Sequence, residues 1–489
     1  MEQRDVDVLI VGAGISGIGA AYHLGAHCPN KSYLVLEGRD TLGGTWDLFR
    51  YPGIRSDSDM YTLGFSFRPW TNPKAIADGP SILAYLRETA EAYGITDKIR
   101  YRHRVERASF SSETSRWTVE VRVREDESDT EGTVVVYTCA FLFMCAGYYD
   151  YENGYTPEFP GRERFTGKVV HPQKWTSDID YEGKRVVVIG SGATAVTLVP
   201  ELAKRAAHVT MLQRSPTYIV SMPERDAVAD FMRGRLPEKA VYFVTRWKNV
   251  LSSMAVYNLC RKFPERAKKT LVGLVNRQVG EKLDVSTHFT PTYDPWDQRL
   301  CLVPNGDLFR TLRSGKASVV TDHIETFTET GIRLRSGDEL PADLVVTATG
   351  LNLKFLGGLR MTVDGVAIEP DKTMAYKGAM LSDVPNLALA IGYTNASWTL
   401  KSDLTSEYVC RLLAHMDQHG YRRATPRRTD PSLREEPIMD FSSGYVKRAI
   451  DRFPRQGSAA PWRLYQNYAL DLVTFRHAAL EDGVMQFSR

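Results

Sequence analysis

The chain lacks the cysteine patterns that build disulfide frameworks and metal sites. Its six cysteines show no Cys-x-x-Cys pair and no regular spacing, so neither a disulfide-stapled scaffold nor a bound metal is expected. Reduced thiols of this kind are typical of cytoplasmic proteins. The six residues are Cys28, Cys139, Cys145, Cys260, Cys301 and Cys410.

Long apolar runs and a strong net charge are also missing. No window approaches the roughly 18–20 apolar residues that a membrane-spanning helix needs. An apolar strand that begins by Val6 leaves no room for a signal peptide. The formal net charge of +3 over 489 residues is too small to indicate a nucleic-acid partner. A cytoplasmic globular protein of about two to four domains is therefore expected.

Two glycine-rich fingerprints stand out among the features that are present. One follows the apolar run 8–11 and the other follows the apolar run 186–189. In a βαβ unit such glycines let the backbone approach a pyrophosphate, and the helix N-terminus supplies partial positive charge. Both copies lie between a buried-strand run and a small-residue helix start, so we interpret them as two dinucleotide sites. The assigned residues are Gly12, Gly14, Ser16 and Gly17, and Gly190, Ser191, Gly192, Ala193, Thr194 and Ala195.

The residues that follow the two fingerprints differ in charge. The first fingerprint leads to Glu37, and the second leads to Gln213, Arg214 and Ser215. A carboxylate at this place hydrogen-bonds free ribose hydroxyls and repels a phosphate, whereas an arginine binds a 2′-phosphate. We therefore predict FAD (or NAD) at the first site and NADPH at the second.

Two loops place polar groups where a cleft is expected. The stretch 43–47 has two glycines before an aromatic residue, which suits a backbone that passes close to a flat ring system. The Tyr-Pro-Gly turn at 51–53 is rigid, and Arg55 and Asp57 emerge from it like site residues. A later loop braced by Pro and Trp carries Arg299, which stays cationic at every working pH and can neutralise a developing oxyanion. A structural ion pair is the alternative role for this arginine.

The pattern FxGxxxHxxxW at 165–175 lies at a domain crossing. Gly167 and Pro172 limit how the chain can turn there. We expect His171 to be a hinge or network residue rather than a base that takes a proton from substrate.

The order of these motifs predicts an α/β fold with two Rossmann-like dinucleotide-binding domains, the second inserted in the first, and a helical insertion. The Tyr-, Pro- and Gly-rich stretch 148–161 is interpreted as a linker. Within the first domain we expect a strand at 99–105, hairpin strands at 117–123 and 133–137, and a separate strand at 140–145. The expected parts are 1–150 and 349–489 for the FAD domain, 151–222 and 296–348 for the NADPH domain, and 223–295 for the helical insertion.

The motif series resembles the flavin-dependent Baeyer–Villiger monooxygenases that use FAD and NADPH. The resemblance spans essentially the whole chain. Trp175, where the sister flavin-containing monooxygenases have Tyr or Phe, separates the chain from them. The matching stretches are 12–17 (GAGISG), 43–46 (GGTW), 51–57 (YPGIRSD), 165–175 (FTGKVVHPQKW), 190–195 (GSGATA), 213–216 (QRSP), 297–299 (DQR) and 348–350 (ATG).

The resemblance implies roles for residues around the flavin. Gly44, Thr45, Trp46 and Asp47 would line the flavin, and Val105 would bind the adenine through its backbone. These roles are inferred only from the position of each residue within the matching motifs.

The resemblance also implies the catalytic pair. Asp57 would sit beside Arg299 across the isoalloxazine, and Arg55 would contact a cofactor. Many members carry a lysine directly before the arginine, where it helps hold the 2′-phosphate. Gln298 stands there, so the NADPH preference would rest more heavily on Arg214.

The implied reaction converts ketones to esters or lactones through a flavin C4a-peroxide, with O2 as co-substrate and transfer to thioether or thioamide sulfur as a second activity. The partner is therefore a small-molecule ketone or sulfur compound. Two alternatives stay open: an N- or S-hydroxylating flavin monooxygenase without ketone activity, and a non-catalytic flavin-binding redox sensor. A flavin disulfide reductase would need a cysteine pair near the flavin, and none follows the first fingerprint.

The helical stretch 224–284 contains 13 Lys or Arg against 7 Asp or Glu. A basic amphipathic helix can lie on an anionic membrane. The alternative is one solvated face of a helical subdomain. Peripheral membrane contact and the oligomeric state both stay open at this level.

Overall fold

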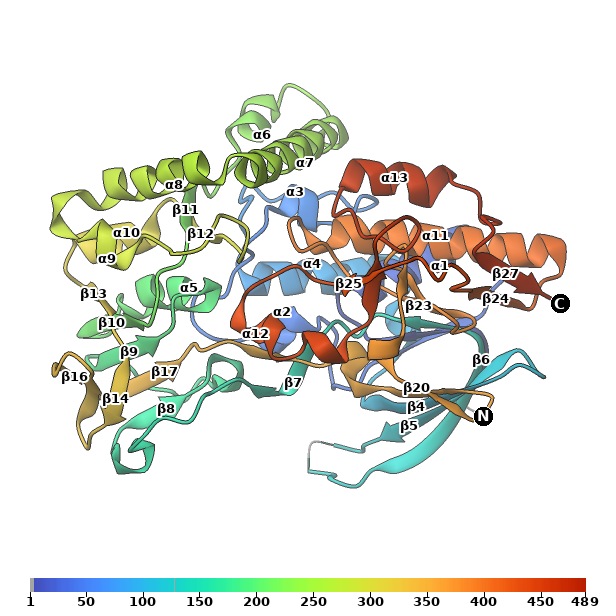
Figure 1. Ribbon diagram of the computed structural model, residues 1–489, viewed down its shortest axis with the longest axis horizontal. Helices are drawn as coiled ribbons and strands as arrows, with labels where there is room; N and C mark the ends of the chain where they lie inside the picture. The colour runs from blue at the N-terminus through green and yellow to red at the C-terminus, as the bar shows by residue number, and fades with distance from the viewer. Residues whose placement is uncertain (1–3, 127) are drawn as a thin grey trace.

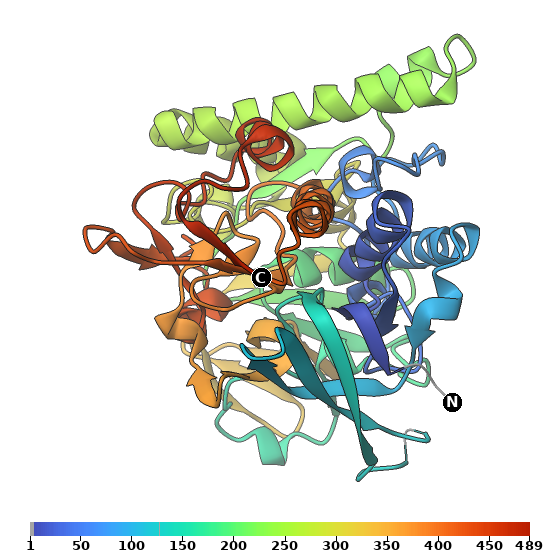
Figure 2. The ribbon, with the colours of Figure 1, turned by 90° about the vertical axis from the view of Figure 1, so that its right-hand side faces the viewer.

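Two separate β-sheets organise the chain, one drawn from residues before 145 and after 359, and one from the middle (Figure 1). The computed structural model describes residues 4–126 and 128–489. Helices α1 (Ile15–His27) and α11 (Trp398–His419) pack on one another over the first sheet. Figure 2 shows a further layer of long helices across the top of the molecule.

Within the described residues, nine strands form the first sheet, in the order β20-β19-β4-β5-β6-β1-β2-β3, with β23 paired to β6. β1 runs parallel to both β2 and β6, as a dinucleotide-binding unit requires. The residues from Val8 to Val11 are at most 8% exposed because the sheet is covered on both faces. The strands are β1 (Asp5–Val11), β2 (Tyr33–Leu36), β3 (Ile99–Arg100), β4 (His103–Ser111), β5 (Arg116–Val123), β6 (Thr133–Met144), β19 (Arg360–Val363), β20 (Val366–Ile368) and β23 (Leu387–Leu389).

In the part of the chain that the structure describes, the second sheet has five strands, in the order β13-β10-β9-β17-β8, all parallel. Helix α5 (Ala193–Leu202) follows β9, and α10 (Asp307–Arg313) packs against it. The α/β fold class with two Rossmann-like units is confirmed, and the domain boundaries stay a prediction. The strands are β8 (Lys168–Val170), β9 (Arg185–Ile189), β10 (His208–Gln213), β13 (Ala317–Thr321) and β17 (Leu344–Thr347).

The two units turn from strand to helix in the same way. Gly12 follows β1 with φ +104°, and Gly190 follows β9 with φ +136°. A Cβ on Gly12 would lie 2.7 Å from the Cys145 carbonyl oxygen, and one on Gly190 would lie 2.3 Å from that of Ala348. Only glycine fits a positive φ and so close a neighbouring strand. Both helices therefore begin directly beneath the carboxyl edge of their sheet.

The helical insertion bridges the two units. α7 (Glu238–Lys262) packs on α3 (Met60–Leu63) of the first unit, and α8 (Pro264–Val279) packs on α10 of the second. None of the helices in the described ranges combines the length and apolarity that a bilayer crossing needs.

The remaining elements near the insertion and the cavity are α2 (Thr45–Leu48), α4 (Gly79–Ala92), β11 (Ile219–Met222), α6 (Ala227–Met232), α9 (Val285–His288), β12 (Cys301–Pro304), α12 (Gly444–Lys447) and α13 (Tyr468–His477). The short outer strands are β14 (Ile324–Phe327), β15 (Gly331–Leu334), β16 (Glu339–Pro341), β21 (Ala375–Tyr376), β22 (Met380–Leu381), β24 (Arg423–Pro426), β25 (Glu435–Pro437), β26 (Arg455–Gly457) and β27 (Met485–Ser488).

Three local expectations were wrong. The stretch 148–161 is more than a linker, because β7 (Tyr149–Gly154) pairs antiparallel with β18 (Leu351–Leu353). The two segments expected at 133–137 and 140–145 are one strand, β6. The strand expected at 99–105 is broken by Arg102, which has φ +59°.

Candidate active site

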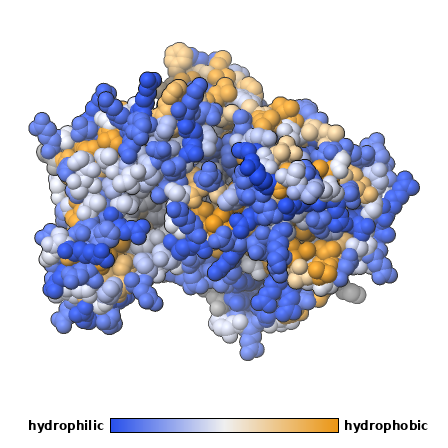
Figure 3. All heavy atoms as spheres, viewed as in Figure 1, coloured by the Kyte–Doolittle hydropathy of each residue, from blue (hydrophilic) through white to orange (hydrophobic). Residues whose placement is uncertain are grey.

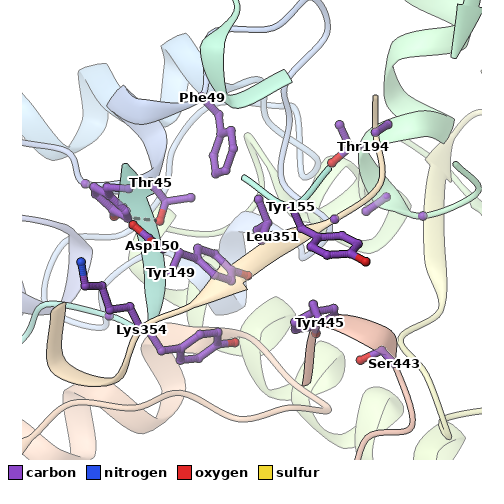
Figure 4. A pocket seen from close by; sticks show the side chains of 18 of the residues that line it. Thr45, Phe49, Tyr149, Asp150, Tyr155, Thr194, Leu351, Lys354, Ser443 and Tyr445 are labelled. Atoms are coloured by element: carbon purple, nitrogen blue, oxygen red, sulfur yellow. Dashed lines mark hydrogen bonds between the residues drawn. The ribbon is translucent and has the colours of Figure 1, made fainter. Parts of the chain in front are cut away.

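A cavity of about 1120 Å³ runs between the two sheets and is lined by both glycine fingerprints (Figure 4). The strand edges that carry the fingerprints therefore face one shared space. The predicted site residues that line it are Gly12, Gly14, Ser16, Glu37, Gly44, Thr45, Trp46, Arg55, Asp57, Val105, Gly190, Ser191, Gly192, Ala193, Thr194, Arg214, Ser215, Gln298 and Arg299.

Glu37 ends β2 at the wall of the first unit. Its side chain is buried, and its two carboxylate oxygens accept hydrogen bonds from the backbone N–H groups of Ala13 (2.7 Å) and Arg39 (2.9 Å). Burial raises the pKa of this carboxyl group. A carboxylate has about four lone-pair positions, so Glu37 keeps acceptors for hydroxyl groups of a ligand.

The neighbouring wall is held by side-chain hydrogen bonds. Trp398 donates its Nε1–H to Ser16 Oγ at 2.7 Å, and Thr45 Oγ1 lies 3.2 Å from the Tyr151 hydroxyl (Figure 4). Asp47 does not line the cavity, because its side chain is 1% exposed and pairs with two arginines instead. Asp47 therefore lies in the same short helix as Thr45, α2, but with its side chain turned to the arginines.

The second wall begins with α5 and the end of β10. Ser191 Oγ donates to the Ser215 carbonyl at 3.0 Å and so fixes the two loops together. Arg214 lines the cavity and is exposed, and among the described residues no hydrogen-bond or ion-pair partner is found for it. Gln213 points away from the cavity, because its Nε2 donates to the His288 carbonyl at 2.7 Å and to a threonine hydroxyl.

Gly17 and Ala195 also lie off the cavity, each one turn into its helix. Both are buried: a Cβ on Gly17 would lie 1.8 Å from the Gly12 carbonyl oxygen, and Ala195 is part of the core of the second unit. Their contribution is close packing of helix on sheet, which is the usual reason for a small residue there.

Arg299 and Asp57 meet in the wall between the two fingerprints. Arg299 Nε lies 2.8 Å from Asp57 Oδ2, and Nη2 donates to Oδ1 at 3.2 Å. The carboxylate raises the pKa of the guanidinium further above its usual value, so Arg299 stays charged. Arg55, from the same turn as Asp57, pairs with Asp307 at the start of α10 (2.5 Å). Two ion pairs therefore join the turn at 51–57 to the second unit: Asp57 with Arg299, and Arg55 with Asp307.

The family of flavin-binding monooxygenase-like proteins matches this chain over residues 73–414. The chain belongs to this family. It is therefore an enzyme of the flavin monooxygenase class, as the motif series predicted. An NAD(P)-binding Rossmann-like domain matches residues 10–76, which contain the first fingerprint.

Curated relatives cover the chain end to end. FAD-containing monooxygenase EthA of Mycobacterium tuberculosis is 56% identical over 485 residues, which are 99% of this chain and 98% of that protein. EthA of Mycolicibacterium smegmatis is 54% identical over 484 residues, 99% of this chain and 97% of that protein. Among solved structures, an oxidised steroid monooxygenase bound to NADP shares the fold with a TM-score of 0.76, 24% identity and 99% coverage of both chains. A polycyclic ketone monooxygenase from Thermothelomyces thermophila has a TM-score of 0.76 at 16% identity, over 100% of this chain and 90% of that one.

Sequence reasoning missed a group of aromatic residues in this monooxygenase cavity. Tyr149 and Tyr155 come from the stretch interpreted as a linker, and Tyr445 comes from α12 (Figure 4). The guanidinium of Arg448 lies 3.4 Å from the centre of the Tyr155 ring. The density of tyrosine at 148–155 was the available signal, because so many aromatic residues rarely serve only a linker.

His171 does not line the cavity. It links its own segment to the segment around Gly350, where the chain returns from the second unit to the first. Its Nε2 donates to the Gly350 carbonyl at 3.1 Å, and its Nδ1 accepts from the Gln173 N–H at 3.2 Å. A Cβ on Gly154 would lie 2.0 Å from the imidazole ring. Burial lowers the pKa of His171, which suits a neutral ring. Its expected role as a network residue is confirmed by these contacts.

The cysteines and the possible metal-ligating side chains are characterised by their burial and their grouping. All six cysteines are free and buried. Within residues 4–126 and 128–489, no cluster of His, Cys, Asp and Glu could hold a metal ion.

Proposed function

We propose that this protein is an FAD-containing, NADPH- and O2-dependent Baeyer–Villiger monooxygenase that converts ketones to esters or lactones and also oxygenates thioether or thioamide sulfur. The observation that carries the proposal is the Arg299–Asp57 pair, placed in one cavity between two dinucleotide fingerprints. The relatives named FAD-containing monooxygenase and the steroid monooxygenase bound to NADP support the same pairing of cofactors.

The first wall fits FAD. The positive φ of Gly12 and its close contact with the Cys145 carbonyl leave bare backbone at the start of α1, which suits a pyrophosphate. Glu37 would accept hydrogen bonds from ribose hydroxyls, and Val105, which also lines the cavity, would contact the adenine through its backbone. Thr45 and Trp46 also line the cavity, and a flat ring would lie against them.

The second wall fits NADPH. Arg214 is a cation at the end of β10 with no partner in the described part of the chain, so a 2′-phosphate would meet an unpaired guanidinium. Gln298 lines the cavity and adds an amide but no charge. Arg214 therefore would carry the preference for the phosphorylated nucleotide.

When bound, the two cofactors supply a hydride and the activation of O2. Arg299 supplies a fixed positive charge toward which negative charge can develop on oxygen. Asp57 orients the guanidinium through two hydrogen bonds and keeps it protonated. Tyr149 and Tyr445 lie beside this pair and line the cavity, where aromatic side chains exclude water from the reacting groups.

The test is oxygen-dependent NADPH consumption by the purified protein with a panel of ketones and thioethers. The proposal expects ester or lactone formation matched to NADPH oxidised, and sulfoxide from the thioethers. Sulfoxide without any ester would instead identify an N- or S-hydroxylating monooxygenase. No substrate-dependent NADPH consumption from a flavin-loaded protein would favour the redox-sensor alternative.

Replacement of the strand-end glycines should separate the two nucleotide sites. Gly12→Ala should give protein with little bound FAD, because the new methyl group meets the Cys145 carbonyl at 2.7 Å. Gly190→Ala should keep FAD while its reduction by NADPH slows by about tenfold or more, since an alanine is strained at this φ and displaces the loop. Flavin absorbance per protein and anaerobic reduction rates measure both effects.

Gly273→Ala is the matched control for these variants. Gly273 lies within α8, and a Cβ there meets nothing within 4 Å, so alanine should be neutral or slightly stabilising. Loss of FAD from Gly190→Ala and its retention by Gly12→Ala would reverse the assignment of the two sites.

A further inference from the structure

The outward face of the helical insertion is unusually apolar for a soluble surface. Of the 18 exposed large apolar side chains found among the described residues, 11 lie between Met222 and Leu274. Figure 3 shows apolar (orange) atoms gathered along the upper edge of the molecule, over α6 and α7. The 11 side chains are Met222, Val228, Phe231, Leu236, Phe243, Val244, Leu251, Val256, Leu259, Phe263 and Leu274.

The inner face of α7 is already fully engaged by the protein. Arg246 is buried and donates to the carbonyls of Tyr61 (2.7 Å) and Gly64 (2.9 Å). The hydroxyl of Tyr242 donates to the Phe65 carbonyl at 3.0 Å. These bonds fix which side of the helix faces the first unit, so the opposite side is held outward.

The outer face of α7 carries large apolar side chains where a surface helix normally carries polar ones. Phe243 is 62% exposed, Leu251 is 56% exposed and Leu259 is 57% exposed. α13 touches α7 through the Tyr468 and Trp247 rings, whose centroids are 5.9 Å apart, and its Val473 is 57% exposed. We call these four exposed side chains, with Phe231 of α6, the apolar face.

Cations surround the apolar face. α7 and α8 contain nine Lys or Arg and two Glu. Lys239 lies near the start of α7, and Lys262 and Lys269 lie near its end and in α8; all three are exposed. The stripe of apolar side chains therefore has positive charge at both ends.

We propose that the apolar face docks on an anionic lipid bilayer. Shallow insertion of aromatic and aliphatic side chains and attraction of flanking lysines to headgroup phosphates are the two forces that hold an amphipathic helix in an interface. A second copy of the chain would fit this face poorly, because an isologous contact would bring its cations against the same cations. A bilayer that contains anionic lipid satisfies both the apolar side chains and the charges.

Docking would place the catalytic loop close to the bilayer. Tyr257 of α7 contacts Trp296, with ring centroids 5.4 Å apart, and Arg261 pairs with Asp297 at 2.7 Å. Arg299 follows two residues later in the chain. An apolar substrate dissolved in the bilayer would thus meet the side of the protein that carries this loop. This consequence rests on the proposed function, whereas docking itself does not.

Vesicle sedimentation tests the docking directly, without any activity measurement. The FAD-loaded protein should sediment with vesicles of phosphatidylcholine and phosphatidylglycerol, and much less with phosphatidylcholine alone. The triple variant Phe243→Ser, Leu251→Ser and Leu259→Ser should lower the bound fraction by about tenfold. The matched control is Val134→Ser with Val136→Ser, two residues that are 50% and 46% exposed on β6, at the far edge from α7 (Figure 1). The control should bind like the original protein.

Charge reversal gives a second, independent measurement. Lys239→Glu with Lys262→Glu and Lys269→Glu should weaken binding to anionic vesicles by about tenfold or more, and added salt should reproduce part of the loss. The control reverses three exposed lysines elsewhere, Lys168, Lys316 and Lys372, and should bind normally. Equal losses in the control variants, or no sedimentation of the original protein, would overturn the proposal. So would a concentration-dependent dimer that the serine variants abolish, because the face would then be a contact between copies.

Discussion

Replacement of Arg299 by alanine should leave a yellow, FAD-loaded protein that no longer oxygenates ketones at a useful rate. The guanidinium is bound to Asp57 by two hydrogen bonds, and neither residue belongs to the first fingerprint, so its loss should leave that fingerprint intact. A fixed charge that meets developing negative charge contributes about a hundred- to a thousandfold in rate. The ester product, quantified against bound flavin absorbance, measures the effect.

Two variants at the same pair separate charge from geometry. Arg299→Lys keeps a cation but loses the planar two-nitrogen contact with Asp57, and it should recover only part of the rate. Asp57→Asn should lower the rate less than Arg299→Ala, because the charge stays while its orientation loosens. Ketone turnover by Arg299→Ala that equals that of the original protein would refute the assigned role.

Replacement of Arg214 by alanine should raise the Michaelis constant for NADPH by about ten- to a hundredfold, in line with the loss of one charge-assisted hydrogen bond. The constant for NADH should change little, because this nucleotide has no 2′-phosphate. The reason is that the exposed guanidinium lines the cavity and has no partner among the residues that the structure describes. Steady-state rates with both nucleotides measure the difference.

The controls for Arg214 use neighbouring positions of the second unit. Arg205→Ala removes an exposed arginine that pairs with Glu182 outside the cavity, and it should leave both constants unchanged. Gln298→Lys adds a cation to the cavity wall and should lower the Michaelis constant for NADPH. Equal increases for both nucleotides in Arg214→Ala would show that this residue does not bind the 2′-phosphate.

The sequence predicted well those helices and strands whose formation depends on residues close to one another in the chain. β1, α1 and β2 follow from an apolar run, a glycine turn and a small-residue helix start within residues 5–36. β7 could not be predicted in this way, because its partner β18 lies about two hundred residues later. The break at Arg102 could not be predicted either, because this residue adopts a positive φ although it is neither glycine nor asparagine.

The site residues show the same contrast between features set by nearby sequence and features set by distant contacts. Glu37 and Arg214 follow their fingerprints at nearly fixed distances, and both line the cavity. Tyr445 reaches it only because the C-terminal segment folds back, where the Ser442 N–H donates to the Asp297 carbonyl at 2.8 Å. Such a contact depends on the assembled molecule, so no local pattern could have placed Tyr445 in the site.

The pairing of β7 with β18 brings the two ends of the segment between residues 155 and 350 side by side. Gly154 faces Leu351, and the Tyr155 N–H donates to the Gly350 carbonyl at 3.1 Å. An insert whose ends are adjacent can be exchanged without stretching the host. The whole segment is thus a natural unit for chimeras, in which a relative's nicotinamide preference is grafted onto an unaltered flavin-binding half.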